Sequence, residues 1–373
     1  MQDWMAEARR VHAESVVLDM HADTPQRFVD EDWAFAEEDL QGGHLSLPTA
    51  QIGGLDGEFF AAWVDPHEWA GQFAERTRAL IDGIHAQADT GAMQVCLTAD
   101  DVLAAKAAGR FAALIGIEGG HSIEGRLDLL EEFYTRGVRY MTLTWSNTNE
   151  WADSSGDVAR HGGLTELGRN VVRTMNRLGM IVDVSHVSDA TFWDVMKVAE
   201  GPVIASHSSA RALTTAPRNL TDEMMRSVAA SGGIVGINFF PAFIDEEWRA
   251  AWNALRPERA ARHKEAAQPF RERGEAVPFH ISDAVDREYS AKIGRAPFRS
   301  LIDHFLHALE IVGPEHVGIG TDFDGIPEPP EGIDSAADLP KVTAALLEAG
   351  VSPDDMKKVL GGNLLRVLDA TCR

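Results

Sequence analysis

The amino-acid sequence predicts a single (β/α)8 barrel, and two observations support that prediction. Eight short apolar runs recur along the 373 residues, and stretches with helical periodicity separate most of them. Ionisable residues follow the carboxyl ends of five of these runs, and barrel enzymes build their sites on that face. A doubly wound open sheet is the alternative, and it would draw its site from fewer strands near one switch point. The runs are 16–21, 58–64, 111–118, 138–144, 180–186, 202–207, 233–239 and 316–322.

The local sequence predicts the individual elements. Runs rich in β-branched residues, such as IVDVS and PVIAS, suit strands that are buried on both faces of a parallel sheet. The start of the chain, MQDWMAEARRVHAES, is typical of an amphipathic helix. Further helices are expected where good helix formers recur at helical spacing, for example over 100–108, 163–178 and 188–200.

The stretch 241–300 departs from this regular alternation. It lies between the seventh and eighth predicted strands and is far longer than the roughly 2–6 residues of an ordinary connection. Its 11 basic and 10 acidic residues give a charge of +1, whereas the remaining 23 basic and 48 acidic residues give −25. We therefore predict one hydrolase barrel over 1–373 with a helical insertion at 241–300. The insertion would form a lid over the barrel mouth or join two subunits of a homodimer; a solvated helical decoration is the alternative.

Composition excludes several classes of protein. The chain carries 34 basic and 58 acidic residues, a net charge of −24, which argues against binding to nucleic acid or to an anionic membrane surface. The two cysteines cannot form a disulfide framework, which favours a reducing compartment. No apolar run approaches the roughly 18 residues of a membrane span, and the start has no signal-peptide core. We expect a cytoplasmic protein.

The strongest local indication of chemistry is the sequence MHAD at the end of the first predicted strand. Side chains alternate along a strand, so His21 and Asp23 point to the same side. An imidazole nitrogen and a carboxylate oxygen are ligands that Zn²⁺ accepts. A histidine and an aspartate at this spacing also occur in turns and caps, so the motif needs support from elsewhere in the chain.

That support comes from four other strand ends. His186 and His207 each follow an apolar strand and a serine in consecutive strand–helix units, so they can approach one ion. Glu118 ends a buried strand, where an unpaired carboxylate would be costly and where it can bridge two cations. Asp322 ends the eighth predicted strand and is placed as a general acid or base. Together these residues predict a binuclear metal hydrolase, whose two cations would activate a bridging hydroxide.

The sequence also resembles a known family. The segments VLDMHADTP, GIEGGHS, TLTWSNTNEWADSS, IVDVSH, IASHSSARAL, PRNLTDEM, GTDFDG and GGNLLRV occur in the order found in the renal or membrane dipeptidase family, metallopeptidases of the amidohydrolase superfamily. This resemblance covers nearly the whole chain and implies a bacterial-type dipeptidase with two Zn²⁺ ions. The implied substrate is a dipeptide, hydrolysed by the metal-bridging hydroxide with tolerance for a D-residue at the C-terminal position.

The resemblance also implies a role for individual residues. His21 and Asp23 would bind one zinc, His186 and His207 the other, and Glu118 would bridge them. Asp322 would relay a proton, and Arg218 would hold the substrate carboxylate. An ion pair of Arg218 with Asp222 or Glu223 is the structural alternative, and Arg211 is the competing carboxylate anchor.

Two features differ from the animal members of that family. Those members carry a substrate-binding histidine after TLT, where this chain has Trp145, and Asn147 and Asn149 are nearby candidates for the missing contact. The insertion and the missing secretion apparatus are the second difference, and they leave the substrate open. An amidohydrolase for a non-peptide amide or lactone, such as an N-acyl amino acid, is therefore the alternative function. A barrel kept only for binding is disfavoured, because the predicted ligands and Asp322 are all retained.

Overall fold

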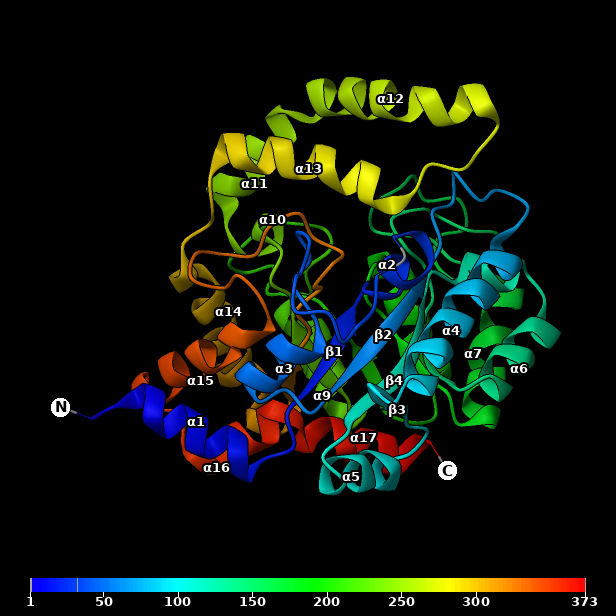
Figure 1. Ribbon diagram of the computed structural model, residues 1–373. Helices are drawn as coiled ribbons and strands as arrows, with labels where there is room; N and C mark the ends of the chain where they lie inside the picture. Colours follow the sequence, from blue (N-terminus) through cyan, green and yellow to red (C-terminus); the bar gives the residue numbers. More distant parts are fainter. Residues whose placement is uncertain (1, 32, 373) are drawn as a thin grey trace.

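A computed structural model describes residues 2–31 and 33–372 of the chain. It contains a closed barrel of parallel strands surrounded by helices (Figure 1). The predicted (β/α)8 fold is therefore confirmed. The strands are β1 Leu18–Ala22, β2 Gly57–Trp63, β3 Met93–Val95, β4 Phe111–Glu118, β5 Val138–Thr142, β6 Ile181–Asp183, β7 Val203–Ala205, β8 Ile234–Ile237 and β9 Val317–Ile319.

The strand order shows how the barrel closes. The sheet runs β2-β1-β9-β8-β7-β6-β5-β4, and β2 pairs with β4 to complete a ring of eight. Each of the eight predicted apolar runs overlaps one strand of this ring, to within one residue at β1 and β2. The sequence did not predict β3, which pairs only with the start of β4, outside the ring.

Helices connect the strands, and short 3-10 or π segments (η) occur among them. Their bounds are α1 Trp4–Glu14, α2 Pro25–Asp30, α3 Leu47–Gly53, α4 Phe73–Asp89, α5 Ala99–Ala107, η1 Gly120–Ile123, α6 Leu127–Thr135, α7 Glu166–Leu178, α8 Asp189–Val198, α9 Asp222–Ala230, α10 Pro241–Ile244, α11 Glu246–Ala254, α12 Arg256–Arg273, α13 Phe279–Ile293, α14 Phe298–Val312, η2 Pro314–His316, η3 Ala336–Asp338, α15 Leu339–Glu348, α16 Pro353–Lys357, η4 Lys358–Gly362 and α17 Asn363–Thr371. None of the described helices combines the length and the apolarity needed to cross a membrane.

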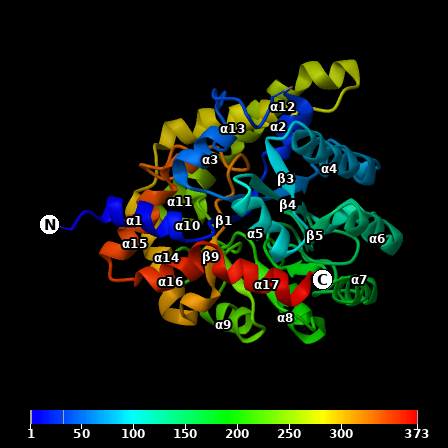
Figure 2. The ribbon, with the colours of Figure 1, turned by 60° about the horizontal axis from the view of Figure 1, so that its bottom comes forward.

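Large side chains fill the inside of the barrel. Tyr140 is fully buried, and a Cβ on Gly116 would lie 2.3 Å from the Tyr140 ring, so only glycine leaves room for it. Helix α17 crosses the amino-terminal end of the barrel, and its Leu364 and Leu368 pack against the interior cluster (Figure 2). The carboxyl ends of the strands therefore open on the opposite face, below α12 and α13.

Helices α11, α12 and α13 belong to the stretch between β8 and β9. They share a small apolar cluster of their own, in which the indoles of Trp248 and Trp252 stack 5.0 Å apart. Only Ala267 of α12 is buried, so this helix contributes little to the main core. The helices of this stretch form a separately packed layer above the barrel mouth (Figure 1).

Candidate functional site

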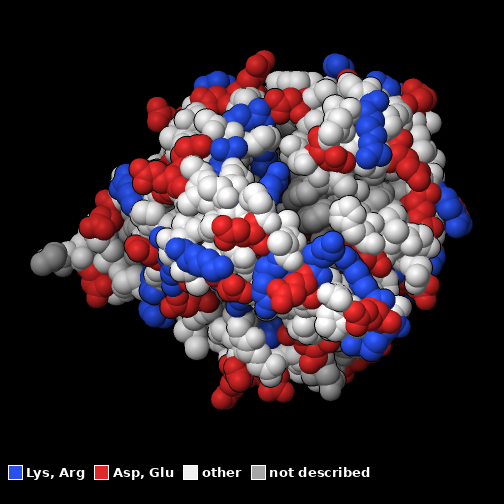
Figure 3. All heavy atoms as spheres, turned by 90° about the horizontal axis from the view of Figure 1, so that it is seen from above, with Lys and Arg blue, Asp and Glu red and all other residues white. Residues whose placement is uncertain are grey.

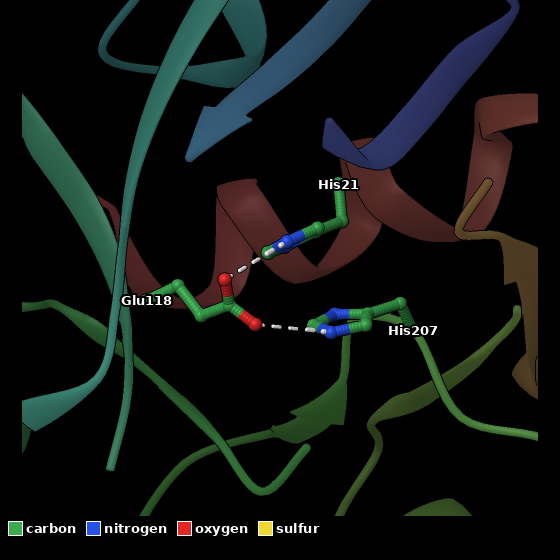
Figure 4. A group of neighbouring side chains, drawn as sticks. All are labelled: His21, Glu118 and His207. Atoms are coloured by element: carbon green, nitrogen blue, oxygen red, sulfur yellow. Dashed lines mark ion pairs between the residues drawn. The ribbon is translucent and has the colours of Figure 1, made fainter. Parts of the chain in front are cut away.

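Glu118 lies at the centre of a cluster of buried side chains at the carboxyl ends of the strands. Its Oε2 atom is 3.7 Å from Nε2 of His21. Its Oε1 atom is 2.7 Å from Nε2 of His186 and 3.3 Å from Nε2 of His207. Figure 4 shows the carboxylate of Glu118 at the edges of the stacked rings of His21 and His207, with one oxygen toward each ring. A carboxylate whose two oxygens face different histidines can bridge two cations.

Asp23 and Asp322 extend this cluster on the side of His21. Oδ2 of Asp23 is 3.5 Å from Nε2 of His21. One ligand atom each from His21, Asp23 and Asp322 lie within 4.8 Å of one another. Asp322 also accepts a hydrogen bond of 2.9 Å from the side-chain amide of Asn238. The structure thus brings together the six residues that the sequence singled out at strand ends.

The neighbouring Asp324 does not share this arrangement. Its Oδ2 accepts a hydrogen bond of 2.6 Å from the hydroxyl of Thr24, and its Oδ1 accepts one of 2.6 Å from the backbone N–H of His44. Both oxygens of Asp324 therefore hold loops together. Asp322, two residues earlier in the chain, is the carboxylate that faces the cluster.

The donors in the cluster fit a divalent metal. Nε2 of His21 and Oδ1 of Asp23 are buried without a hydrogen-bond partner among the described residues. Nε2 of His186 lies only 3.1 Å from Nε2 of His207. Buried nitrogen and oxygen lone pairs that face one another are costly unless something binds them. Imidazole and carboxylate groups together form a ligand set that Zn²⁺ accepts.

Burial shifts the pKa of three of these donors, His186, His207 and Glu118. It lowers the pKa of His186 and of His207 well below the usual range of histidine, so both rings are neutral near pH 7. It also raises the pKa of Glu118 to about 7, and the nearby Asp23 adds to the rise. Neutral imidazoles have a free lone pair, so a cation need not displace a proton from these histidines.

Arg218 lies in the loop between β7 and α9, with 8% of its surface exposed. Its Nη1 donates a hydrogen bond of 2.7 Å to the hydroxyl of Ser208, while Nε and Nη2 are buried without a partner among the described residues. Burial lowers the pKa of this guanidinium to about 10, so it stays charged near neutral pH. Arg218 thus has two donors available for a planar acceptor.

The contacts of the two arginines bear on the alternative roles considered for them. Arg211 forms a two-pronged ion pair with Asp189, at 2.7 Å for each nitrogen. Asp222 is paired with His307 at 2.8 Å, and the described ion pairs include none between Arg218 and either Asp222 or Glu223. Arg218 is therefore the better placed of the two arginines to bind a carboxylate.

A cavity of about 700 Å³ opens above the cluster. Glu118, His186, Asp322 and Trp145 line its floor, and residues of α12 and α13 line its roof. Asn147 does not belong to the described lining, although it follows closely after Trp145. Figure 3 looks down on this face, which is hollowed and carries acidic and basic residues interspersed. The size is ample for a small peptide, since pockets for drug-sized ligands span about 300–1,000 Å³.

Comparison with known proteins decides the family. The model of the membrane dipeptidase family (peptidase family M19) matches residues 5–372. The chain belongs to this family. It is a dipeptidase, as the resemblance of its motifs predicted, and the family is one of metallopeptidases.

Relatives of this dipeptidase support the assignment. The dipeptidase verJ of Clonostachys rogersoniana is 30% identical over 99% of this chain and 88% of its own length. The dipeptidase tcpJ of Claviceps purpurea is 31% identical over 87% of this chain and 69% of its own length. The crystal structure of the probable dipeptidase PvdM from Pseudomonas aeruginosa superposes with a TM-score of 0.83, at 26% identity, and covers 99% of this chain and 98% of its own.

One solved relative of this dipeptidase contains a ligand. A metallopeptidase from Rhodobacter sphaeroides, crystallised with a phosphinate mimic of the dipeptide L-Ala-D-Ala, superposes with a TM-score of 0.75 at 26% identity. The match covers 96% of this chain and 99% of that one. A dipeptide is thus a small-molecule substrate consistent with the family and with the cavity.

Three buried polar residues that contact the candidate site were not found by sequence reasoning. The hydroxyl of Tyr140 lies 2.7 Å from Nδ1 of His21, and the hydroxyl of Ser206 lies 2.7 Å from Nδ1 of His207. Asp183, in turn, accepts a hydrogen bond of 2.6 Å from the hydroxyl of Ser206. One signal was available: a polar side chain within a buried apolar strand needs a partner, and all three belong to such runs.

Proposed function

We propose that this dipeptidase is a binuclear zinc enzyme that hydrolyses L-Xaa-L-Xaa and L-Xaa-D-Xaa dipeptides. The observation that supports the proposal is the placement of Glu118, whose oxygens face His21 on one side and His186 and His207 on the other. In this proposal His21 and Asp23 would hold one ion, His186 and His207 would hold the other, and Glu118 would serve both.

A bound pair of zinc ions would supply a water molecule of lowered pKa and polarise the scissile carbonyl. The side chains of the chain do the rest. Arg218 binds the C-terminal carboxylate of the dipeptide through its two free donors. Asp322 accepts a proton from the attacking water and passes it to the leaving amine, while Asn238 fixes the orientation of its carboxylate.

Helices α12 and α13 cover the site in this proposal. Arg271 of α12 pairs with Glu68 at 3.1 Å, and the backbone N–H of Val277 donates to the same carboxylate at 3.3 Å. Ala267 and Val277 line the cavity below. A cover of this kind limits the access of water and the size of the substrate. Sedimentation equilibrium would show whether these helices also join two copies in a homodimer.

Metal content and substrate stereochemistry test the proposal together. Protein purified without chelator should contain two zinc ions per chain by elemental analysis, and Glu118→Gln should contain fewer. The same preparation should hydrolyse both Ala-L-Ala and Ala-D-Ala. One ion per chain at full activity would overturn the binuclear site, and hydrolysis of the L,L dipeptide alone would overturn the stereochemical part.

A further inference from the structure

Three aromatic side chains from distant parts of the chain meet on one wall of the cavity. They are Trp63 at the end of β2, Trp145 in the loop after β5, and Phe279 at the start of α13. The ring of Trp63 lies 4.9 Å from that of Trp145 and 5.5 Å from that of Phe279, with interplanar angles of 55° and 71°. We call these three residues the aromatic corner.

The aromatic corner is continuous with the proposed metal site. Trp63 pairs in register with Glu118 across β2 and β4, so the two side chains emerge beside each other at the barrel mouth. The ring of Trp145 lies 6.4 Å from the ring of His186. All four residues line the same cavity of about 700 Å³. A group that occupies the aromatic corner is thus within reach of a bond positioned over Glu118.

Part of the ring surface of the aromatic corner is exposed to the cavity. Trp63 is buried, but Trp145 and Phe279 are only half-buried and face the cavity. Rings that meet at steep angles leave a concave surface between them, which a third apolar group can fill edge-to-face. The two methyl side chains of a bound Ala-Ala dipeptide would leave most of this aromatic surface in contact with water.

We propose that the aromatic corner is a specificity subsite for a large apolar side chain of the dipeptide, aromatic or branched aliphatic. The inference rests on the proposed function, because it assumes that the scissile bond lies over Glu118. Burial of apolar surface between the rings stabilises the bound substrate and its transition state. In hydrophobic pockets each added methylene changes kcat/KM by about 10-fold or more, so the preference over alanine should reach at least that size.

Phe279 connects this specificity to the helices above the barrel. Its ring lines the aromatic corner on one side and a second cavity of about 510 Å³ on the other. That second cavity is lined by charged residues, among them Arg27, Asp283 and Arg287. Truncation of Phe279 would therefore open the aromatic corner toward a charged, hydrated space and weaken its preference for apolar groups.

The test compares kcat/KM for Ala-Ala, Phe-Ala, Ala-Phe, Leu-Ala and Ala-Leu with the zinc-loaded enzyme. The best of the four larger dipeptides should exceed Ala-Ala by at least 10-fold. In Phe279→Ala this ratio should fall by at least 5-fold, and Phe279→Leu should restore part of it. A preference for Phe-Ala or for Ala-Phe would assign the subsite to the N-terminal or the C-terminal residue, and either supports the inference.

Phe270→Ala is the matched control, because Phe270 lies on α12 of the same hairpin but does not belong to the described lining of the cavity. It should keep the wild-type ratio. Inhibition constants for phosphinate mimics of Ala-Ala and Phe-Ala provide a second readout that does not depend on turnover. The preference for the Phe-Ala mimic over the Ala-Ala mimic should fall in Phe279→Ala and be kept in Phe270→Ala.

The two proposals fail in different ways. Equal kcat/KM values for all five dipeptides, or an unchanged ratio in Phe279→Ala, would overturn the aromatic corner as a subsite while leaving the metal site intact. Fewer than two metal ions per chain at full activity would overturn the proposed function, whatever the selectivity.

Discussion

The hydroxyl oxygen of Ser206 lies 2.7 Å from Nδ1 of His207, and the same hydroxyl donates to Oδ2 of Asp183 at 2.6 Å. Because its proton goes to Asp183, Ser206 must accept one from Nδ1 of His207. That places the lone pair of His207 on Nε2, which faces Glu118. Hydrogen bonds of this kind fix the tautomer and the orientation of metal-binding histidines.

Ser206→Ala should therefore weaken zinc binding. Loss of the partner of a ligand histidine lowers metal affinity by about 10–100-fold, and we expect a change of that size. Chelator competition would measure the dissociation constants. Ser15→Ala is the control, because it removes a buried hydroxyl that donates only to the carbonyl of Val11, far from the site. Unchanged zinc affinity in Ser206→Ala would show that Ser206 does not orient His207.

The parts of the site that the sequence predicted share one property. Each residue stands at or just beyond the carboxyl end of an apolar strand, and the carboxyl ends of parallel strands meet on one face of a barrel. The position of each residue along the chain was therefore enough to predict that His21, Glu118 and Asp322 lie close together. The barrel itself was predictable for the same reason, since near-continuous apolar runs indicate strands buried on both faces.

What the sequence did not predict depends on contacts between distant residues. The three residues of β3 lie outside the ring and lack a continuous buried pattern, so they resemble a loop. The meeting of Trp63 and Phe279 depends on where α13 packs, which no local pattern encodes. His186 and Asp322 adopt left-handed backbone angles, φ of 68° and 62°. Such angles are uncommon outside glycine, and the residue types gave no sign of them.

Asp322→Asn should strongly reduce turnover while leaving the metal in place. The amide keeps the shape of the carboxylate but cannot accept a proton, and general acid–base catalysis contributes about 10²–10⁴-fold to a rate. We expect kcat for Ala-Ala to fall by that factor, with metal content near that of the wild type. Since Asp322 shares a cluster with His21 and Asp23, a large loss of metal would instead identify it as a ligand.

Glu58→Gln should stabilise the protein at alkaline pH. Glu58 of β2 is fully buried beside its register partner Asp19, and neither of its oxygens has a hydrogen-bond partner among the described residues. Burial, reinforced by Asp19, raises the pKa of Glu58 well above its usual range. The folded state therefore favours the protonated form of Glu58. The contribution of Glu58 to the free energy of unfolding is most favourable at low pH, and it is lost as the pH rises toward the raised pKa.

The neutral amide of glutamine at position 58 avoids the cost of burying an ionised carboxylate. Chemical denaturation of the metal-free protein should show a gain of at least about 1 kcal/mol for Glu58→Gln at pH 8, the scale of an unsatisfied buried group, and a smaller gain at pH 5. Glu348→Gln, an exposed substitution on α15, should change the free energy of unfolding by less than about 0.5 kcal/mol. A gain that does not depend on pH would contradict the assigned protonation of Glu58.

Arg218→Lys should separate recognition of the substrate carboxylate from the chemical step. A guanidinium grips a planar carboxylate through two parallel hydrogen bonds, whereas an ammonium group cannot reproduce that geometry. Nε and Nη2 of Arg218 are buried and lack partners, so they are available for this contact. We expect KM for dipeptides to rise by a factor equivalent to about 1–3 kcal/mol, with a smaller effect on kcat.

Dipeptide amides and a second arginine supply the controls for this variant. An amide has no carboxylate, so Ala-Ala amide should be a poor substrate of the parent enzyme and nearly insensitive to Arg218→Lys. Arg173→Lys alters only surface contacts with Glu166 and Asn170 on α7, interactions worth about 0–1 kcal/mol, and should leave KM unchanged. Equal rates of the parent enzyme on Ala-Ala and its amide would show that Arg218 does not read the carboxylate.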